Sequence, residues 1–295
     1  MKKDLNILIK KQQKEFDIYY KQLLGSILPK NKLSKVMFYG AFSKAKRIRP
    51  FLTEIFAKLA KIEKKNYLRI SSAIESIHSY SLIHDDLPSM DDDDYRRGKL
   101  SVHKKFDEAQ AILAGDSLHD VAFELLSDIK THHDSRIRIE LIRKLSINIG
   151  AKGLAGGQSL DLIYENKNTN KKNILNMYKM KTSSLFSFCC EAPFIMSRKN
   201  NKQMQFAKEY GNLFGLIFQI VDDYLDVVEK FNKIGKTPKK DIKQGKSTIL
   251  KFIDKKDIIL YCENLSENFI SKNKNFFFKW PILKDLLYYI IYRRS

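Results

Sequence analysis

Apolar side chains recur along much of this chain with the spacing of an α-helix. Between residues 70 and 80 they fall at Ile70, Ala73, Ile74, Ile77 and Tyr80, which places them on one helix face. Alternation with a period of two, flanked by hairpin turns, is missing. The pattern therefore predicts an all-α protein with roughly ten helices.

The helical pattern is interrupted at several places by proline, glycine or polar residues. Breaks are expected near residues 29, 88–98, 131–135, 166–172, 198–202 and 231–246. No change of composition and no internal repeat divides the chain. We therefore expect one domain over residues 1–295, large enough to fold without disulfide or structural-metal crosslinks.

The chain is strongly basic, with 54 Lys and Arg against 34 Asp and Glu and a formal net charge of +20. Such a charge can indicate a nucleic-acid partner or an anionic membrane. The lysines, however, are scattered from Lys2 to Lys284 without a block of five consecutive basic residues. No helix-turn-helix or RNA-binding signature accompanies them. We expect no nucleic-acid partner.

Targeting and membrane signals are also scarce. The longest uncharged run, residues 210–221, has 12 residues, whereas a membrane span needs about 20. The N-terminal segment lacks the pattern of a secretory or mitochondrial signal. Cys189, Cys190 and Cys262 lack the spacing of a disulfide framework or a metal site. These features predict a cytoplasmic protein without stable membrane association.

The most specific chemistry lies in two aspartate clusters. The first places six carboxylates within residues 85–94, directly after an apolar helix. A solvated acidic loop is the simple interpretation, but two details favour a cation site. Asp85 and Asp86 lie at the helix end that repels negative charge. Pro88 breaks the helix, so that Asp85 and Asp91 can converge on one cation.

The second cluster follows 137 residues later and contains Asp222, Asp223 and Asp226. Asp222 and Asp226 share one helix face, where like charges destabilise the helix unless something neutralises them. Carboxylate oxygens together with substrate phosphates suit Mg²⁺. The two clusters therefore favour chemistry in which a diphosphate group departs with the help of charge neutralisation.

Cations surround the first cluster. Only 11 of the basic residues are arginines, yet four of them stand at Arg47, Arg49, Arg96 and Arg97. The planar guanidinium suits bidentate binding of phosphate. His78 lies on the same side of its helix as Asp85, so it is either a buried histidine or a phosphate donor.

These motifs, in this order, resemble the trans-prenyl diphosphate synthases, and among them the bacterial farnesyl diphosphate synthases. The resemblance runs over about residues 39–293 and includes KRIRPF, HDDLPSMDDDDYRRG, GGQSLDL, MKTSSL and FQIVDDYLDVV. It implies an isoprenoid synthase fold, in which helices surround a central active-site cavity. It also implies a homodimer and a cofactor of two or three Mg²⁺ ions.

The resemblance assigns roles to individual residues. The leading metal ligands are Asp85, Asp86, Asp91 and Asp222, followed by Asp92, Asp223 and Asp226. Isopentenyl diphosphate would be bound by Lys46, Arg49, His78 and Arg97. The allylic diphosphate would be held by Arg96, Lys181 and Lys236. Lys181, Thr182 and Gln219 are the expected catalytic group, and the oxygens of Thr182 and Gln219 would face the developing carbocation.

The implied reaction condenses isopentenyl diphosphate with dimethylallyl or geranyl diphosphate to give farnesyl diphosphate. Tyr80, five residues before Asp85, resembles the bulky floor that stops a product at fifteen carbons. Synthases of geranyl or geranylgeranyl diphosphate remain alternatives. An aspartate-rich terpene cyclase is disfavoured, because Lys46, Arg49 and Arg97 would provide a second diphosphate site.

One departure from the family pattern concerns the loop before Lys46. The usual pair of glycines is replaced by Lys44 and Ala45. If the backbone needs a positive φ at this point, a side chain is strained there. We therefore expect the loop at the isopentenyl diphosphate site to sit differently.

Overall fold

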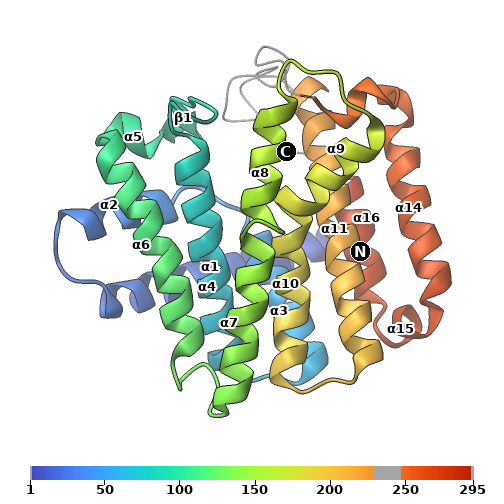
Figure 1. The fold of residues 1–295 in the computed structure, drawn as a ribbon. Helices are drawn as coiled ribbons and strands as arrows, with labels where there is room; N and C mark the ends of the chain where they lie inside the picture. Colours follow the sequence, from blue (N-terminus) through green and yellow to red (C-terminus); the bar gives the residue numbers. More distant parts are fainter. Residues whose placement is uncertain (1, 229–246, 294–295) are drawn as a thin grey trace. The chain divides into compact units, whose positions relative to one another are not determined.

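The structure is a computed structural model, and it describes residues 2–228 and 247–293. Within this part, almost all of the secondary structure is helical (Figure 1), which confirms the predicted all-α class. The described residues fall into two compact units. The N-terminal unit comprises residues 6–142 and 195–197, and the C-terminal unit comprises the remainder. The expectation of a single domain stays a prediction.

The N-terminal unit is organised around helix α4, which packs against α3 and α6. Its elements are α1 (Lys2–Ile27), α2 (Lys32–Ala41), α3 (Ile48–Ala60), α4 (Lys64–Asp85), β1 (Tyr95–Arg96), β2 (Lys99–Leu100), α5 (Val102–Lys105), α6 (Glu108–Ser127) and the first part of α7 (Ser135–Ile149).

Small side chains allow α4 to be buried on all sides. Residues 67–77 are all buried, and three of them are serines. The hydroxyl of Ser72 donates to the Leu68 carbonyl at 2.8 Å, and Ser76 Oγ lies 2.8 Å from Tyr20 Oη. Because the hydroxyls of Ser72 and Ser76 have partners, burying them carries little penalty. The buried helix is thereby able to hold its C-terminal acidic residues in one place.

The C-terminal unit is organised around helix α11, which contacts η1, α14 and α16. Its elements are the end of α7, α8 (Leu154–Tyr164), α9 (Lys171–Tyr178), the π-helical turn η1 (Lys179–Ser183), α10 (Ser184–Met196), α11 (Asn201–Val228), the 3₁₀ turns η2 (Ile249–Lys251) and η3 (Lys255–Asp257), α14 (Ile258–Lys272), α15 (Lys274–Lys279) and α16 (Ile282–Ile291).

Aromatic packing holds the N-terminal half of α11 in place. The ring of Phe206 stacks on Phe276 with centroids 4.1 Å apart, and Phe269 and Trp280 pack around the same ring. Phe206 is 2% exposed. Burial of a side chain of this size stabilises the fold by roughly 1.5–3 kcal/mol. The other end of α11, which carries the second aspartate cluster, is thus anchored through a rigid helix.

Most predicted breaks coincide with helix ends. Those near residues 29, 88–98, 131–135, 166–172 and 198–202 all separate helices, whereas 231–246 lies outside the described residues. The pattern missed several breaks, among them residues 42–47 between α2 and α3, 61–63 between α3 and α4, and 150–153 between α7 and α8. It also missed the hairpin of β1 and β2, whose strands of two residues each are too short to show a period.

The hairpin turn follows from two positive φ angles. Arg97 has φ 53° and Gly98 has φ 77°, as a type I′ turn requires at both central positions. The turn places Arg96 in a strand and Arg97 in the turn itself.

None of the described helices is long and apolar enough to cross a membrane.

Candidate active site

The first aspartate cluster forms a loop that folds back on the end of α4. The helix ends at Asp85, as predicted. The amide of Asp91 then donates to the Asp85 carbonyl at 2.8 Å, and the amide of Asp93 donates to the Asp86 carbonyl at 3.1 Å. These bonds bring the backbones of Asp85 and Asp91 together at the negative end of the helix. Carboxylates gathered there need a cation.

Asp86 and Arg96 are engaged with each other. Arg96 donates from Nε to Asp86 Oδ1 at 2.9 Å, its Nη2 contacts the same oxygen, and Asp93 accepts from Nη2 at 3.3 Å. Burial lowers the pKa of the Arg96 guanidinium, but the Asp86 carboxylate more than reverses this, so the net shift is upward. Asp86 is 3% exposed. The Asp86 carboxylate is therefore held in place by a protein cation.

Two arginines converge on His78. Arg49 Nη1 and Arg97 Nη2 each lie 3.3 Å from His78 Nε2, and Arg97 also donates to Ser43 Oγ at 3.2 Å. Burial, followed by the charges of Arg49 and Arg97, lowers the pKa of His78 well below its usual range. The imidazole is therefore neutral and accepts through Nε2. Within the described part of the chain Arg97 makes no ion pair, so this cluster has positive charge available for an anion.

Arg47 is structural rather than available to a ligand. Its guanidinium donates to Asp17 at 2.7 Å, to Glu75 at 2.8 Å and to the Ala41 carbonyl at 2.9 Å. The residue is 3% exposed and begins α3 in the left-handed conformation, with φ 51°. It fixes the loop that presents the exposed Lys46.

The replacement of the usual glycines does not strain this loop. Positive φ occurs at Arg47 but at neither Lys44 nor Ala45. The side chains at these two positions are therefore compatible with the backbone, and the strain considered from the sequence is not found.

Tyr80 is held on the face of α4 that meets α6. Its ring packs edge-on against His84 at 4.9 Å and His119 at 5.3 Å between centroids. Burial, with smaller contributions from Asp85 and Asp116, raises the pKa of Tyr80. Gly115 makes room for His84: a Cβ at this position would lie 2.2 Å from His84 Nε2. The sequence singled out Tyr80 and did not foresee its two histidine neighbours.

In the C-terminal unit, η1 carries Lys181 and Thr182. The turn lies close to α8, since a Cβ on Gly157 would meet the Lys181 amide nitrogen at 2.1 Å. Lys181 Nζ donates to Asp161 Oδ2 at 2.6 Å. The absence of a side chain at Gly157 thus allows this close packing, which positions a predicted site residue. Asp161 is a partner that the sequence did not indicate.

A hydrogen-bond network joins η1 to the second aspartate cluster. Thr182 Oγ1 donates to Gln219 Oε1 at 2.7 Å, and Gln219 Nε2 donates to Asp223 Oδ1 at 2.8 Å. Tyr178 Oη donates to Asp223 Oδ2 and accepts from the Ile249 amide at 2.9 Å. Burial, followed by the Asp223 charge, raises the pKa of Tyr178 well above its usual range, so it remains a donor. Both oxygens of Asp223 accept bonds from the protein.

Asp222 is the exposed carboxylate of this cluster. Arg293 donates to Asp222 Oδ1 at 2.9 Å and to the Phe218 carbonyl at 3.0 Å, and its guanidinium lies 3.9 Å from the centre of the Phe218 ring. Asp226 is buried, with 3% exposure. Lys236, predicted to hold the allylic diphosphate, lies outside the described residues.

A further group of possible ligands lies beyond the predicted pair. Asp92, Asp94 and His103 each offer an atom within 4.8 Å of the others. Lys104 Nζ already lies 3.0 Å from Asp94, and Ser101 Oγ lies 3.2 Å from His103 Nδ1. A protein cation, Lys104, therefore already lies beside this group.

Comparison with known proteins agrees with this arrangement. Residues 30–259 match the polyprenyl synthetase family. The chain is 40% identical over 216 residues to farnesyl diphosphate synthase of Escherichia coli, covering 72% of each chain. It is 36% identical over 266 residues to farnesyl diphosphate synthase of Haemophilus influenzae, covering 89% of each.

Solved structures give the same assignment. An FPP/GFPP synthase from Zymomonas mobilis superposes with a TM-score of 0.83 at 34% identity, covering 99% of both chains. A geranyltransferase from Helicobacter pylori, solved with magnesium and isoprenyl diphosphate, has a TM-score of 0.81 at 29% identity, covering 94% of both. The chain therefore belongs to the polyprenyl synthetase family, as its motifs indicated.

Proposed function

We propose that this protein is a Mg²⁺-dependent prenyltransferase that makes farnesyl diphosphate from isopentenyl diphosphate and dimethylallyl or geranyl diphosphate. The observation that carries the proposal is the convergence of Arg49 and Arg97 on a neutral His78, close in sequence to the Asp85–Asp91 loop. The relatives named farnesyl diphosphate synthase, at 36–42% identity, support the same activity.

The arginine–histidine cluster fits the second diphosphate. Two guanidinium groups present several N–H donors from fixed positions, and bidentate contacts to phosphate oxygens are the strong form of this interaction. His78 keeps both groups in place without adding a charge. Lys46, exposed just before α3, can add a third cationic group. A terpene cyclase needs no such second site.

The acidic residues fit a hard divalent cation. Asp85 and Asp91 present carboxylate oxygens from a loop closed by a 2.8 Å backbone bond, and Asp222 is exposed on α11. Mg²⁺ bound there would neutralise the charge of a departing diphosphate. Arg96 and Tyr178 hold the carboxylates of Asp86 and Asp223 in position, as Arg293 holds that of Asp222.

The C-terminal residues fit the allylic substrate. Lys181, oriented by Asp161, would bind its diphosphate. Thr182 donates a hydrogen bond to Gln219, so the lone pairs of its hydroxyl oxygen remain for the developing carbocation. Such dipoles, fixed before the reaction, stabilise charge at low reorganisation cost. No dedicated protein base is required, because the diphosphate that has left can accept the proton.

The test is product chromatography after incubation with Mg²⁺, isopentenyl diphosphate and either dimethylallyl or geranyl diphosphate. We expect a fifteen-carbon diphosphate from both primers. Asp91→Asn should lower the rate by more than about a hundredfold, whereas Asp120→Asn, at an exposed position on α6, should retain it. A ten- or twenty-carbon end product would favour the geranyl or geranylgeranyl alternative. Failure to form any elongated product would exclude the proposed function.

We further propose that the protein acts as a homodimer in the cytoplasm. The family resemblance supports the dimer, as do large apolar side chains exposed on α6 and α7, at Ile112, Leu113 and Ile139. Light scattering of the purified protein should give twice the chain mass of 34.5 kDa. Replacing Leu113 with Asp should yield monomers if this face forms the interface.

A further inference from the structure

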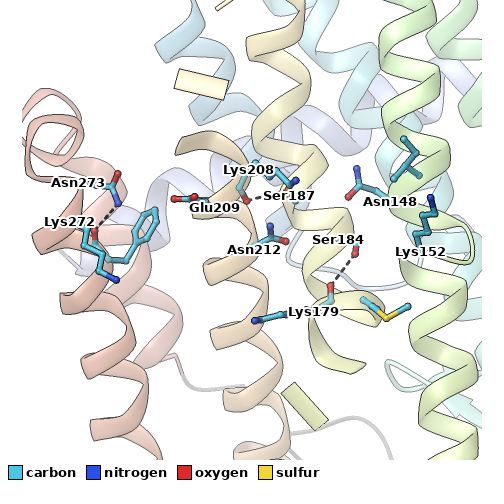
Figure 2. Close-up of a pocket in the computed structure, with 13 residues that line it drawn as sticks. Asn148, Lys152, Lys179, Ser184, Ser187, Lys208, Glu209, Asn212, Lys272 and Asn273 are labelled. Carbon is cyan, nitrogen blue, oxygen red and sulfur yellow. Dashed lines mark hydrogen bonds between the residues drawn. The ribbon is translucent and has the colours of Figure 1, made fainter. Parts of the chain in front are cut away.

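The C-terminal unit contains a basic pocket that includes none of the predicted site residues. It is a hollow of about 760 Å³, within the roughly 300–1,000 Å³ typical of small-molecule sites. Four lysines line it, from the turn after α7 and from η1, α11 and α14: Lys152, Lys179, Lys208 and Lys272. Figure 2 shows Lys272 and Lys152 on opposite sides of the hollow, with Lys179 and Lys208 between them.

The charge of this pocket is not balanced by the protein. In the described part of the chain, none of the four lysines lies within ion-pair distance of a carboxylate. One glutamate, Glu209, lines the pocket, and its Oε1 accepts from Gln205 at 2.5 Å. Four ammonium groups around one hollow repel one another, and a bound polyanion would relieve that repulsion.

Neutral groups of the pocket suit the rest of such a ligand. The carboxamide of Asn212 faces the hollow and makes no hydrogen bond to any described residue, so it is available as a donor. Met180 and Phe269 are partly exposed in the lining. Together they offer contact surface for an organic group beside the cationic one.

The pocket is separate from the candidate active site, although the two share the turn η1. Lys179 and Met180 line the pocket. The next two residues point elsewhere, since Lys181 pairs with Asp161 and Thr182 with Gln219. A ligand in the pocket would therefore bind without occupying the groups assigned to the allylic substrate.

We propose that this pocket binds an organic polyphosphate. Several phosphate charges match the four lysines, and the organic group packs against Met180 and Phe269. The proposal is independent of the prenyltransferase activity, because binding is measured at the lysines themselves. A concave hollow favours a small molecule over the flat surface of a membrane.

The experiment is lysine acetylation of the intact protein in EDTA, read at each lysine by mass spectrometry, with adenosine triphosphate as the probe. A buffer with sodium sulfate of equal ionic strength controls for screening. We expect millimolar probe to slow acetylation of Lys152, Lys179, Lys208 and Lys272 by about threefold or more. Lys202 and Lys274, exposed but outside the pocket, should react unchanged.

A pair of double variants tests the assignment. Lys208→Ala with Lys272→Ala should abolish protection of Lys152 and Lys179. Lys202→Ala with Lys274→Ala removes the same charge and should retain it. Absence of protection, or equal protection of all six lysines, would overturn the proposal. Protection of the pocket lysines by phosphatidylglycerol vesicles but not by adenosine triphosphate would also overturn it, in favour of a lipid surface.

Discussion

At the scale of single residues, hydrogen-bond partners indicate which side chains position others. Asp223 stands beside Asp222 in the sequence, yet its two oxygens accept from Tyr178 and Gln219. A carboxylate so engaged orients the Gln219 amide, and through it the hydroxyl of Thr182. The same reasoning distinguishes Arg47, whose buried guanidinium pairs with Asp17 and Glu75, from Arg97, which makes no ion pair with any described residue.

Removal of the Tyr178 hydroxyl tests the positioning role of Asp223. Tyr178→Phe deletes a donor to Asp223 and the acceptor of the Ile249 amide. We expect kcat to fall by roughly tenfold, because partners behind the reacting groups typically contribute about 10–100-fold. KM for isopentenyl diphosphate should not change, since Arg49, His78 and Arg97 are untouched.

Tyr261→Phe provides the matched control. Its ring contacts Lys171 and lies away from the network. Steady-state kinetics for both variants decide the matter: an unchanged kcat in Tyr178→Phe, or an equal loss in the control, would contradict the assignment.

The neutral state of His78 predicts a pH dependence of stability. Because its pKa is lowered in the folded protein, the unfolded chain binds an additional proton once the pH falls below about 6.5. The contribution of His78 to the free energy of unfolding is therefore fully present well above that pH. It decreases as the pH falls through about 6.5 to 5.5. The loss from this group is at most about 1.4 kcal/mol at pH 5.5.

Guanidinium unfolding at pH 7.5 and 5.5 measures this effect. His78→Asn should be less sensitive to pH than the native protein, whereas the exposed His133→Asn should behave like it. Equal slopes for all three proteins would show that His78 is not held neutral by its arginine neighbours.

At the scale of elements, glycines determine how closely a functional turn can approach a helix. The turn η1 lies against α8 where Gly157 has no side chain, and the nearest atoms belong to the backbone of Lys181 and Met180. A backbone cannot rotate away from a clash as a side chain can. The position of Lys181 therefore depends on the absence of a Cβ on the neighbouring helix.

Gly157→Ala should move η1 away from α8. We expect a loss of stability of about 1–3 kcal/mol, typical of overpacking, and a higher KM for the allylic substrate. Gly25→Ala is the control, since a Cβ there meets nothing within 4 Å and alanine favours the helix. Thermal unfolding and kinetics would contradict the expectation if the two variants behaved alike.

The face of α4 that meets α6 is expected to limit the chain length of the product. Tyr80 is held there by His84 and His119. Tyr80→Ala removes a ring and should allow products longer than fifteen carbons, because each added isoprene unit needs space. Chromatography of the products gives the answer, with Tyr80→Phe as a variant that keeps the ring and should keep the chain length. An unchanged product from Tyr80→Ala would remove Tyr80 from this role.

At the scale of the whole molecule, the net charge of +20 does not describe a single surface. Part of it is concentrated at the Arg49–His78–Arg97 cluster and part at the basic pocket. Much of the remainder is lysine spread along the chain. Small phosphorylated anions fit such local groups, whereas a nucleic acid requires a continuous basic surface.

We therefore expect near-absent binding to duplex DNA at physiological salt. A fluorescence anisotropy titration with a labelled duplex measures this, and a decrease in salt should give only weak, non-specific association. Tight binding with a steep salt dependence would mean that the dispersed lysines form a surface after all.

Much of the fold and part of the site could be predicted from the sequence because their signals are local. The helical period, the breaks and the end of α4 at Asp85 depend on neighbours a few residues apart. The short hairpin at Arg97 was not predicted, because strands of two residues are too short to show an alternation of apolar and polar side chains. The motifs also identified the family, because their residues occur in a fixed order.

The sequence by itself determined the helical class, the two aspartate clusters and the candidate cations. Only the tertiary structure decided their partners: Arg47 with Glu75, Lys181 with Asp161, and Tyr178 with Asp223. These pairs are separated by 28, 20 and 45 residues. Helix packing brings such residues together, and their spacing along the chain does not predict these contacts. A charge becomes a ligand or a support according to what the fold places beside it.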